Sequence, residues 1–189
     1  IAQSEGATGK PFVKYWLHGA HLLVEGKKMS KSLGNFFTLR DLLAKGFWGH
    51  EIRYLLLTSH YRETFNFTLE GLRSAREALT RIGNCLTYLF DLKGNRESEP
   101  DAKLLAIFSE AMDDDLNVSR GWGIIFDWVR STNRLIADGK LSEQQAAQCY
   151  ATWEAVDKVF GIGMSIERVY PAEIEVLSLE REAARKAKD

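Results

Sequence analysis

The feature that most constrains the fold is a series of apolar residues at helical spacing between residues 68 and 160. After Thr68, leucine and isoleucine recur at steps of three, four or seven residues, and similar stripes follow in residues 101–112, 120–137 and 142–160. This spacing places the apolar side chains on one face of each helix, and that face must pack against another helix. Because the connections are short, antiparallel packing is favoured. Residues 69–165 are therefore predicted to form an α-helical bundle.

The sequence before this bundle has a different pattern. Residues 12–24 are rich in β-branched and aromatic residues, which favours two short strands joined near His18 and Gly19. A polar loop begins at Glu25 and is closed by Gly34 and Asn35. Residues 60–67 are expected to be loop or extended chain. Helices are predicted from the Thr38 cap through Leu43, over residues 50–59, and after Pro171. The predicted fold class is mainly α, with a short α/β part that leads into helices.

Composition excludes several classes of protein. The formal net charge of the 189 residues is −1, so a coat of positive potential is absent, although a local basic stripe would suffice for nucleic acid. No apolar run approaches the roughly 20 residues of a membrane span, and the first ten residues do not resemble a signal peptide. A cytoplasmic protein without a membrane partner is expected. The two cysteines, Cys85 and Cys149, lie far apart without ligand spacing, so reduced thiols are favoured over a disulfide or a zinc site.

The polar loop carries the residues with the clearest chemistry. Lys28 and Lys31 lie three residues apart, so both ammonium groups can face one anion, and Ser30 and Ser32 offer hydroxyl groups to the same object. Gly34 permits a tight backbone turn. A loop of this kind suits a polyphosphate, because phosphoryl chemistry depends on positioning and on electrostatic stabilisation. Two lysines alone would favour a solvated surface loop.

A resemblance to a known family adds to this interpretation. The string Lys28-Met29-Ser30-Lys31-Ser32 is the signature loop of class I aminoacyl-tRNA synthetases, and further stretches resemble the cysteinyl-tRNA synthetase family in the same order. These stretches are Ile1–Glu5, Tyr15–His18, Glu51–Leu56, His60–Arg62, Ala111–Asn117, Glu173–Glu175 and Ala184–Asp189. Two stretches depart from the family: Val118-Ser119 stands where Thr-Pro is common, and Gly46–Gly49 is unusually apolar.

The resemblance implies a division of the chain and an activity. Residues 1–35 would end a Rossmann-like nucleotide-binding domain, residues 36–68 would form a connecting region like a stem-contact fold, residues 69–165 a helical bundle of the tRNA-binding type, and residues 166–189 the start of an anticodon region. The implied enzyme uses ATP with Mg²⁺ to form cysteinyl-adenylate and passes the cysteine to tRNA(Cys). In this loop Lys31 would bind the ATP phosphates with help from Lys28, and Met29, Ser30 and Ser32 would complete the site.

The same resemblance implies what this chain would lack. The zinc ligands of the family would precede Ile1, so no residue here is assigned to a metal. The chain begins with Ile1 and stops within a charged run at Asp189, so a fragment is expected. Because the zinc ligands would be missing, this fragment is expected to be inactive alone. A monomer is also expected. The alternatives are a related ligase that passes cysteine to an amino sugar, and a piece that binds tRNA without chemistry.

Basic and acidic residues outside the loop suggest further contacts. Four arginines are predicted to touch tRNA phosphates: Arg53, Arg62, Arg73 and Arg76. Arg73 and Arg76 share a helix face, although pairing with Glu70 and Glu77 on a solvated face is the competing interpretation. The run Asp113–Asp115 could hold a cation, but an acidic turn that joins two helices is favoured because no EF-hand spacing follows it.

Overall fold

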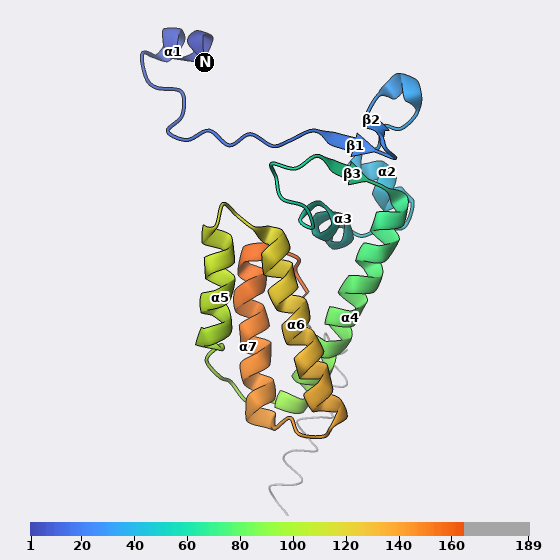
Figure 1. Cartoon of the computed structure of the whole chain (residues 1–189), viewed down its shortest axis with the longest axis vertical. Coiled ribbons are helices and arrows are strands. Elements are labelled where there is room, and N and C mark those ends of the chain that lie inside the picture. The colour runs from blue at the N-terminus through green and yellow to red at the C-terminus, as the bar shows by residue number, and fades with distance from the viewer. Residues whose placement is uncertain (165–189) are drawn as a thin grey trace, which may run out of the picture.

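The computed structural model describes residues 1–164 and shows a small sheet connected to a helical bundle (Figure 1). The elements in chain order are α1 (Ala2–Thr8), β1 (Leu22–Val24), β2 (Lys27–Lys28), the 3₁₀ turn η1 (Lys31–Leu33), α2 (Leu39–Ala44), α3 (Gly49–Leu56), β3 (Phe65–Phe67), α4 (Leu69–Lys93), α5 (Ala102–Asp113), α6 (Val118–Ala137) and α7 (Glu143–Phe160). The mainly α fold class is confirmed. The predicted helix after Pro171 and the region 166–189 lie outside the described residues.

Local capping chemistry defines most helix starts. The Thr68 hydroxyl accepts a hydrogen bond from the Gly71 N–H at 2.9 Å, and Ser142 forms a capping box with Gln145, both as predicted. The prediction that α6 begins at residue 120 was wrong by two residues. The Asn117 side chain accepts from the Arg120 N–H at 3.1 Å, so Asn117 is the cap and the helix begins at Val118.

The sheet differs from the prediction. Its strand order is β2-β1-β3, with β1 and β2 antiparallel and β1 and β3 parallel. Residues 12–20 were predicted to contribute a strand, but they form none in the described structure, because a strand needs a neighbour to satisfy its backbone groups. Instead, residues 65–67 provide that neighbour for β1 and form strand β3.

The core lies where α4 meets α7, with α5 and α6 packed beside them. Helix α4 extends from β3 into the bundle and connects the two parts of the molecule (Figure 1). Its apolar stripe is fully buried at Leu72, Ile82, Leu86 and Leu89, which confirms the predicted inward face. Helix α7 also buries Trp153, Val156 and Phe160. These residues belong to the same core cluster as the buried residues of α4 and of the sheet.

Both cysteines are free thiols, and Cys85 is buried in α4. Burial raises the pKa of the Cys85 thiol to about 12, so it behaves as a small apolar side chain. Within residues 1–164, no cluster of three or more His, Cys, Asp and Glu side chains is arranged to hold a metal ion. None of the described helices combines the length and apolar character needed to cross a membrane.

Candidate functional site

The motif loop, defined as Lys28–Ser32, leaves the sheet at its edge strand. Strands β1 and β2 are joined by a two-residue turn in which Glu25 and Gly26 both have positive φ, at 50° and 74°, as in a type I′ hairpin. Lys28 ends β2 and is exposed, and the chain then enters η1 at Lys31. The hairpin therefore places the motif loop directly after β2, at the edge of the sheet.

The hairpin turn is itself held by β3 and α4. The Glu25 carboxylate accepts a hydrogen bond from the Leu69 N–H at 2.9 Å, and the Glu25 N–H donates to the Phe67 carbonyl oxygen at 3.0 Å. The Gly26 N–H donates to the Asn66 side chain at 2.8 Å. A carboxylate at the N-terminus of α4 is also favoured by the helix dipole. Sequence reasoning identified Glu25 only as the start of a polar loop.

Asn35 determines the shape of the motif loop. Its Oδ1 accepts from the Ser30 N–H at 2.9 Å, while its Nδ2 donates to the carbonyl oxygens of Val24 at 3.2 Å and Lys28 at 3.1 Å. One amide thus joins the strand before the loop to the loop itself, using both its donor and its acceptor. Sequence reasoning placed Asn35 at the end of the loop without this role. The sequence signal for this role was an amide side chain directly after a glycine. In the structure Gly34 has a φ of 66°, a left-handed conformation that favours glycine.

The side chains of the motif loop divide into inward and outward groups. Met29 is half-buried against the core and lines an apolar pocket of about 460 Å³ between the sheet, α2 and α3. The Ser30 and Ser32 hydroxyl oxygens lie 2.7 Å apart and share a hydrogen bond. Met29 therefore anchors the loop by packing, while Lys28 and Ser32 remain exposed.

Replacing Asn35 by alanine is expected to loosen the motif loop without unfolding the protein. The Ser30 N–H loses its acceptor, so its amide hydrogen exchange should become about tenfold faster. Asn35→Asp keeps that acceptor but places a negative carboxylate beside two carbonyl oxygens, so it should loosen the loop as well. Residue-resolved exchange by NMR measures both effects, with Asn95→Ala, which removes the same side chain at an exposed position outside the loop, as the control. Unchanged Ser30 exchange in Asn35→Ala would contradict the role assigned to Asn35.

Arg76 and Glu51 form an ion pair beneath the sheet. Arg76 Nη2 donates to Glu51 Oε2 at 3.0 Å and to the Gly46 carbonyl oxygen at 2.6 Å, and the guanidinium lies 5.1 Å from the centre of the Phe47 ring. Glu51 is 3% exposed. Burial acts to raise the pKa of Glu51, but hydrogen bonds from Arg76 and from the Trp48 N–H outweigh it and lower that pKa. The competing interpretation of pairing with acids on the same helix holds for Arg73 and Glu70, whereas Arg76 pairs with Glu51 of α3. The apolar Gly46–Gly49 segment serves as the platform for the Arg76 pair.

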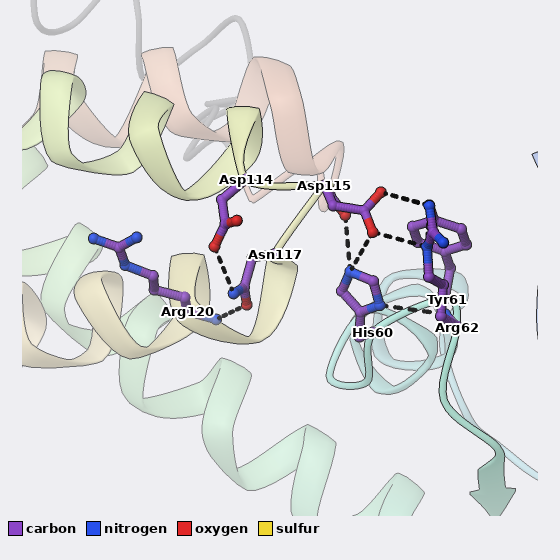
Figure 2. Close-up of polar contacts among 7 residues, drawn as sticks. All are labelled: His60, Tyr61, Arg62, Asp114, Asp115, Asn117 and Arg120. Carbon is purple, nitrogen blue, oxygen red and sulfur yellow. Dashed lines mark hydrogen bonds and ion pairs between the residues drawn. The ribbon is translucent and has the colours of Figure 1, made fainter.

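The other three predicted tRNA arginines also have partners within the chain. Arg53 Nε donates to the Phe160 carbonyl oxygen at 2.6 Å, and Arg73 pairs with Glu70 at 3.0 Å on an exposed face of α4. Arg62 Nε lies 2.8 Å from Asp115 Oδ2, in the cluster shown in Figure 2. Arg53 lines the same apolar pocket as Met29 of the motif loop, whereas Arg62, Arg73 and Arg76 are not among its lining residues. The contact of these four arginines with tRNA stays a prediction.

The acidic run after α5 is a turn that joins two helices, as favoured from the sequence. Asp114 accepts from Asn117 Nδ2 at 3.3 Å, and Asp115 faces His60, Tyr61 and Arg62 (Figure 2). The hydrogen bond from the Tyr61 hydroxyl and the contacts with Arg62 outweigh desolvation and lower the pKa of Asp115. The Asp115 carboxylate therefore joins the turn between α5 and α6 to the segment His60–Arg62.

Comparisons with known proteins match two parts of the chain to two families. The family described as tRNA synthetases class I (C) catalytic domain matches residues 1–77, and the DALR domain matches residues 107–164. The cysteine–tRNA ligase of Chlamydia pneumoniae is 45% identical over 100% of this chain and 41% of its own length. The corresponding proteins of Chlamydia muridarum and Protochlamydia amoebophila are 42% and 39% identical over the whole chain. The chain spans about two-fifths of the length of these curated relatives.

Proposed function

Because this chain belongs to the cysteine–tRNA ligase family of class I synthetases, we propose that it supplies the phosphate-binding side of cysteine activation and a helical segment that contacts tRNA(Cys). The substrates would be ATP, cysteine and tRNA(Cys). A monomeric state and a cytoplasmic location are part of the same proposal. The observation that carries it is the motif loop, which leaves the edge of the sheet and is shaped by Asn35.

The chemistry of the motif loop supports this role. In the proposed reaction the cysteine carboxylate attacks the α-phosphorus of ATP, the bond to the β-phosphate oxygen breaks, and pyrophosphate leaves. Negative charge then grows on the leaving group, where the ammonium groups of Lys28 and Lys31 would stabilise it. Ser30 and Ser32 would donate hydrogen bonds to phosphate oxygens. A loop whose backbone is already ordered by Asn35 needs little reorganisation when this charge appears.

The side chains of the motif loop are not of the types that bind magnesium. Magnesium prefers carboxylate, carbonyl and water oxygens, whereas the motif loop offers lysines, serines and a methionine. The motif loop by itself therefore lacks the ligands for a Mg²⁺ site. The described residues contain no group of three or more His, Cys, Asp and Glu side chains that could hold zinc by themselves.

A chimeric enzyme tests the proposed function. Residues 1–189 replace the aligned segment of the Chlamydia pneumoniae cysteine–tRNA ligase, of which they cover 41%. The chimera is expected to retain cysteine-dependent ATP–pyrophosphate exchange and to charge tRNA(Cys), whereas residues 1–189 alone should show no appreciable exchange. A folded chimera without exchange would overturn the proposal. Exchange without transfer to tRNA would favour the alternative acceptor, an amino sugar.

A further inference from the structure

Two segments that match different families meet at one cluster of polar residues. The Asp115 carboxylate, from the turn between α5 and α6, accepts a hydrogen bond from the Tyr61 hydroxyl at 2.6 Å and pairs with Arg62 Nε at 2.8 Å (Figure 2). The Asp115 carbonyl oxygen lies 2.8 Å from His60 Nε2. Residues 1–77 match the catalytic-domain family and residues 107–164 match the DALR domain, so this cluster joins the two.

The backbone of the acidic turn is shaped to present Asp115. Asp115 and Leu116 have φ values of 52° and 56°, and consecutive left-handed residues with side chains are energetically costly. The turn is maintained by two hydrogen bonds to α5, from the Leu116 N–H to the Met112 carbonyl and from the Asn117 N–H to the Ala111 carbonyl, both at 3.0 Å. In this conformation the carbonyl and the carboxylate of Asp115 both face the segment His60–Arg62.

The segment His60–Arg62 is arranged to receive Asp115. The Arg62 N–H donates to His60 Nδ1 at 3.3 Å, which assigns the proton to Nε2, the nitrogen that faces the Asp115 carbonyl. Arg62 Nε also donates to the Tyr61 hydroxyl oxygen at 2.8 Å, which leaves that hydroxyl hydrogen for Asp115. Each of the three side chains is thus oriented toward the turn.

The same segment holds the strand that leads to the motif loop. The Ala20 N–H donates to the Tyr61 carbonyl oxygen at 2.7 Å, and the Phe65 N–H donates to the His21 carbonyl oxygen at 3.3 Å. Strand β3 begins at Phe65 and pairs in parallel with β1, which continues through the hairpin into Lys28. Side chains of residues 60–62 therefore hold the acidic turn, while the Tyr61 carbonyl holds residue 20, which leads into the strand before the motif loop.

We propose that Asp115 is a positioning residue that orders the strand before the motif loop from the helical segment, through Tyr61 and Arg62. Tyr54 of α3 packs against the rings of Trp122 and Phe126 in α6, with ring centroids 4.7 and 6.4 Å apart. Two further hydrogen bonds join the segments, from Ser119 Oγ to the Thr58 carbonyl at 2.9 Å and from Arg53 to the Phe160 carbonyl at 2.6 Å. Neither of these hydrogen bonds involves a residue that is itself hydrogen-bonded to β1 or to residue 20. The cluster at Asp115 is thus a contact through which a ligand on the helical segment can influence the loop, and only this last consequence rests on the proposed function.

Amide hydrogen exchange of residues 1–189, followed by NMR, tests the positioning role. Asp115→Asn removes the charge but tolerates the left-handed conformation, and Asp113→Asn is the matched control, because Asp113 has the same charge and its side chain has no hydrogen bond or ion pair with any residue of the described part. Asp115→Asn is expected to speed exchange of the Ala20 and Phe65 amides about tenfold. Exchange in α4 and α7 should stay unchanged, and Asp113→Asn should resemble the parent.

Two results would overturn the inference. One is unchanged Ala20 and Phe65 exchange in Asp115→Asn, and the other is an equal acceleration throughout α4 and α7, which would mean a general loss of stability. Tyr61→Phe keeps the backbone carbonyl and removes the hydroxyl, so it should reproduce part of the Asp115→Asn effect and add little to it in the double variant. Full additivity of the two substitutions would also count against the proposed path.

A titration with a tRNA(Cys) transcript separates this inference from the proposed function. In the parent chain the amide signals of α6 and of the motif loop should both shift, whereas in Asp115→Asn those of α6 alone should shift. Loop shifts that persist in Asp115→Asn would overturn the coupling. A parent chain whose α6 signals do not respond to tRNA would contradict the tRNA-binding part of the proposed function, while the exchange measurements would still decide the role of Asp115.

Discussion

Replacing Lys31 by alanine in the chimeric enzyme is expected to lower cysteine-dependent ATP–pyrophosphate exchange by about 100-fold. The proposed reaction builds negative charge on the departing pyrophosphate, and the family resemblance assigns Lys31 to those oxygens. A positioned cation acts mainly on the transition state, so the loss should fall on the rate of adenylate formation. Affinity for tRNA(Cys), measured by filter binding, should remain close to that of the unsubstituted chimera.

The neighbouring strand offers a matched control for this variant. Lys27 lies in β2 directly before the motif loop and is exposed, so Lys27→Ala removes the same charge from the same hairpin. Its exchange rate should fall no more than about threefold, because a solvated charge outside the site is largely screened. Equal losses of exchange and of tRNA affinity in Lys31→Ala would refute the role assigned to Lys31, and so would equal losses of exchange in the two lysine variants.

Substitution of Arg76 is expected to destabilise the protein much more than substitution of Arg73, although both arginines lie on α4. Arg76→Ala leaves the buried carboxylate of Glu51 without its cation, so the melting temperature should fall by about 5 to 10 °C. Arg73→Ala breaks only an exposed pair with Glu70 and should lower the melting temperature by less than about 2 °C. Thermal unfolding followed by circular dichroism measures both values.

The dependence of stability on pH provides a second test of the Arg76 pair. In the parent chain the pKa of Glu51 is below its ordinary value of 4.5, so the pair stabilises the fold above that pH, and the contribution is lost as the pH falls through the lowered pKa. In Arg76→Ala burial acts without a cation to oppose it, so the pKa of Glu51 should rise and acidification should recover part of the lost stability. Equal melting temperatures for the two arginine variants, with equal losses of tRNA affinity, would instead favour the prediction that both arginines contact RNA.

The helical half of the fold could be predicted because its determinants are local. Thr68 caps α4 through the amide three residues later, and Ser142 and Gln145 satisfy each other across the same interval. Apolar residues at helical spacing, such as Leu72 and Leu86, had to face a partner helix whatever the topology. The small sheet could be predicted less well, because residues 12–17 have the composition of a strand but pair with no strand in the described part.

The candidate site divides in the same way. The five residues of the motif loop are contiguous, so the sequence alone identified the loop and the family to which it belongs, and the loop lies in the segment that matches the catalytic-domain family. Sequence reasoning could not determine that Met29 faces the core or that Asn35 shapes the loop. Both depend on where the hairpin turns, and that is decided by hydrogen bonds from β3 and α4.

The sequence by itself determined most helices and caps, and the motif loop that resembles class I synthetases, whose phosphate-binding role is proposed. Only the tertiary structure decided what Arg76 and Arg62 do, because their partners are distant in the chain: Arg76 meets Glu51 25 residues away, and Arg62 meets Asp115 53 residues away. An arginine in a sequence fits a nucleic-acid contact and an internal ion pair equally well. The choice depends on which carboxylate the folded backbone brings within hydrogen-bonding distance, and packing of the whole chain determines that distance.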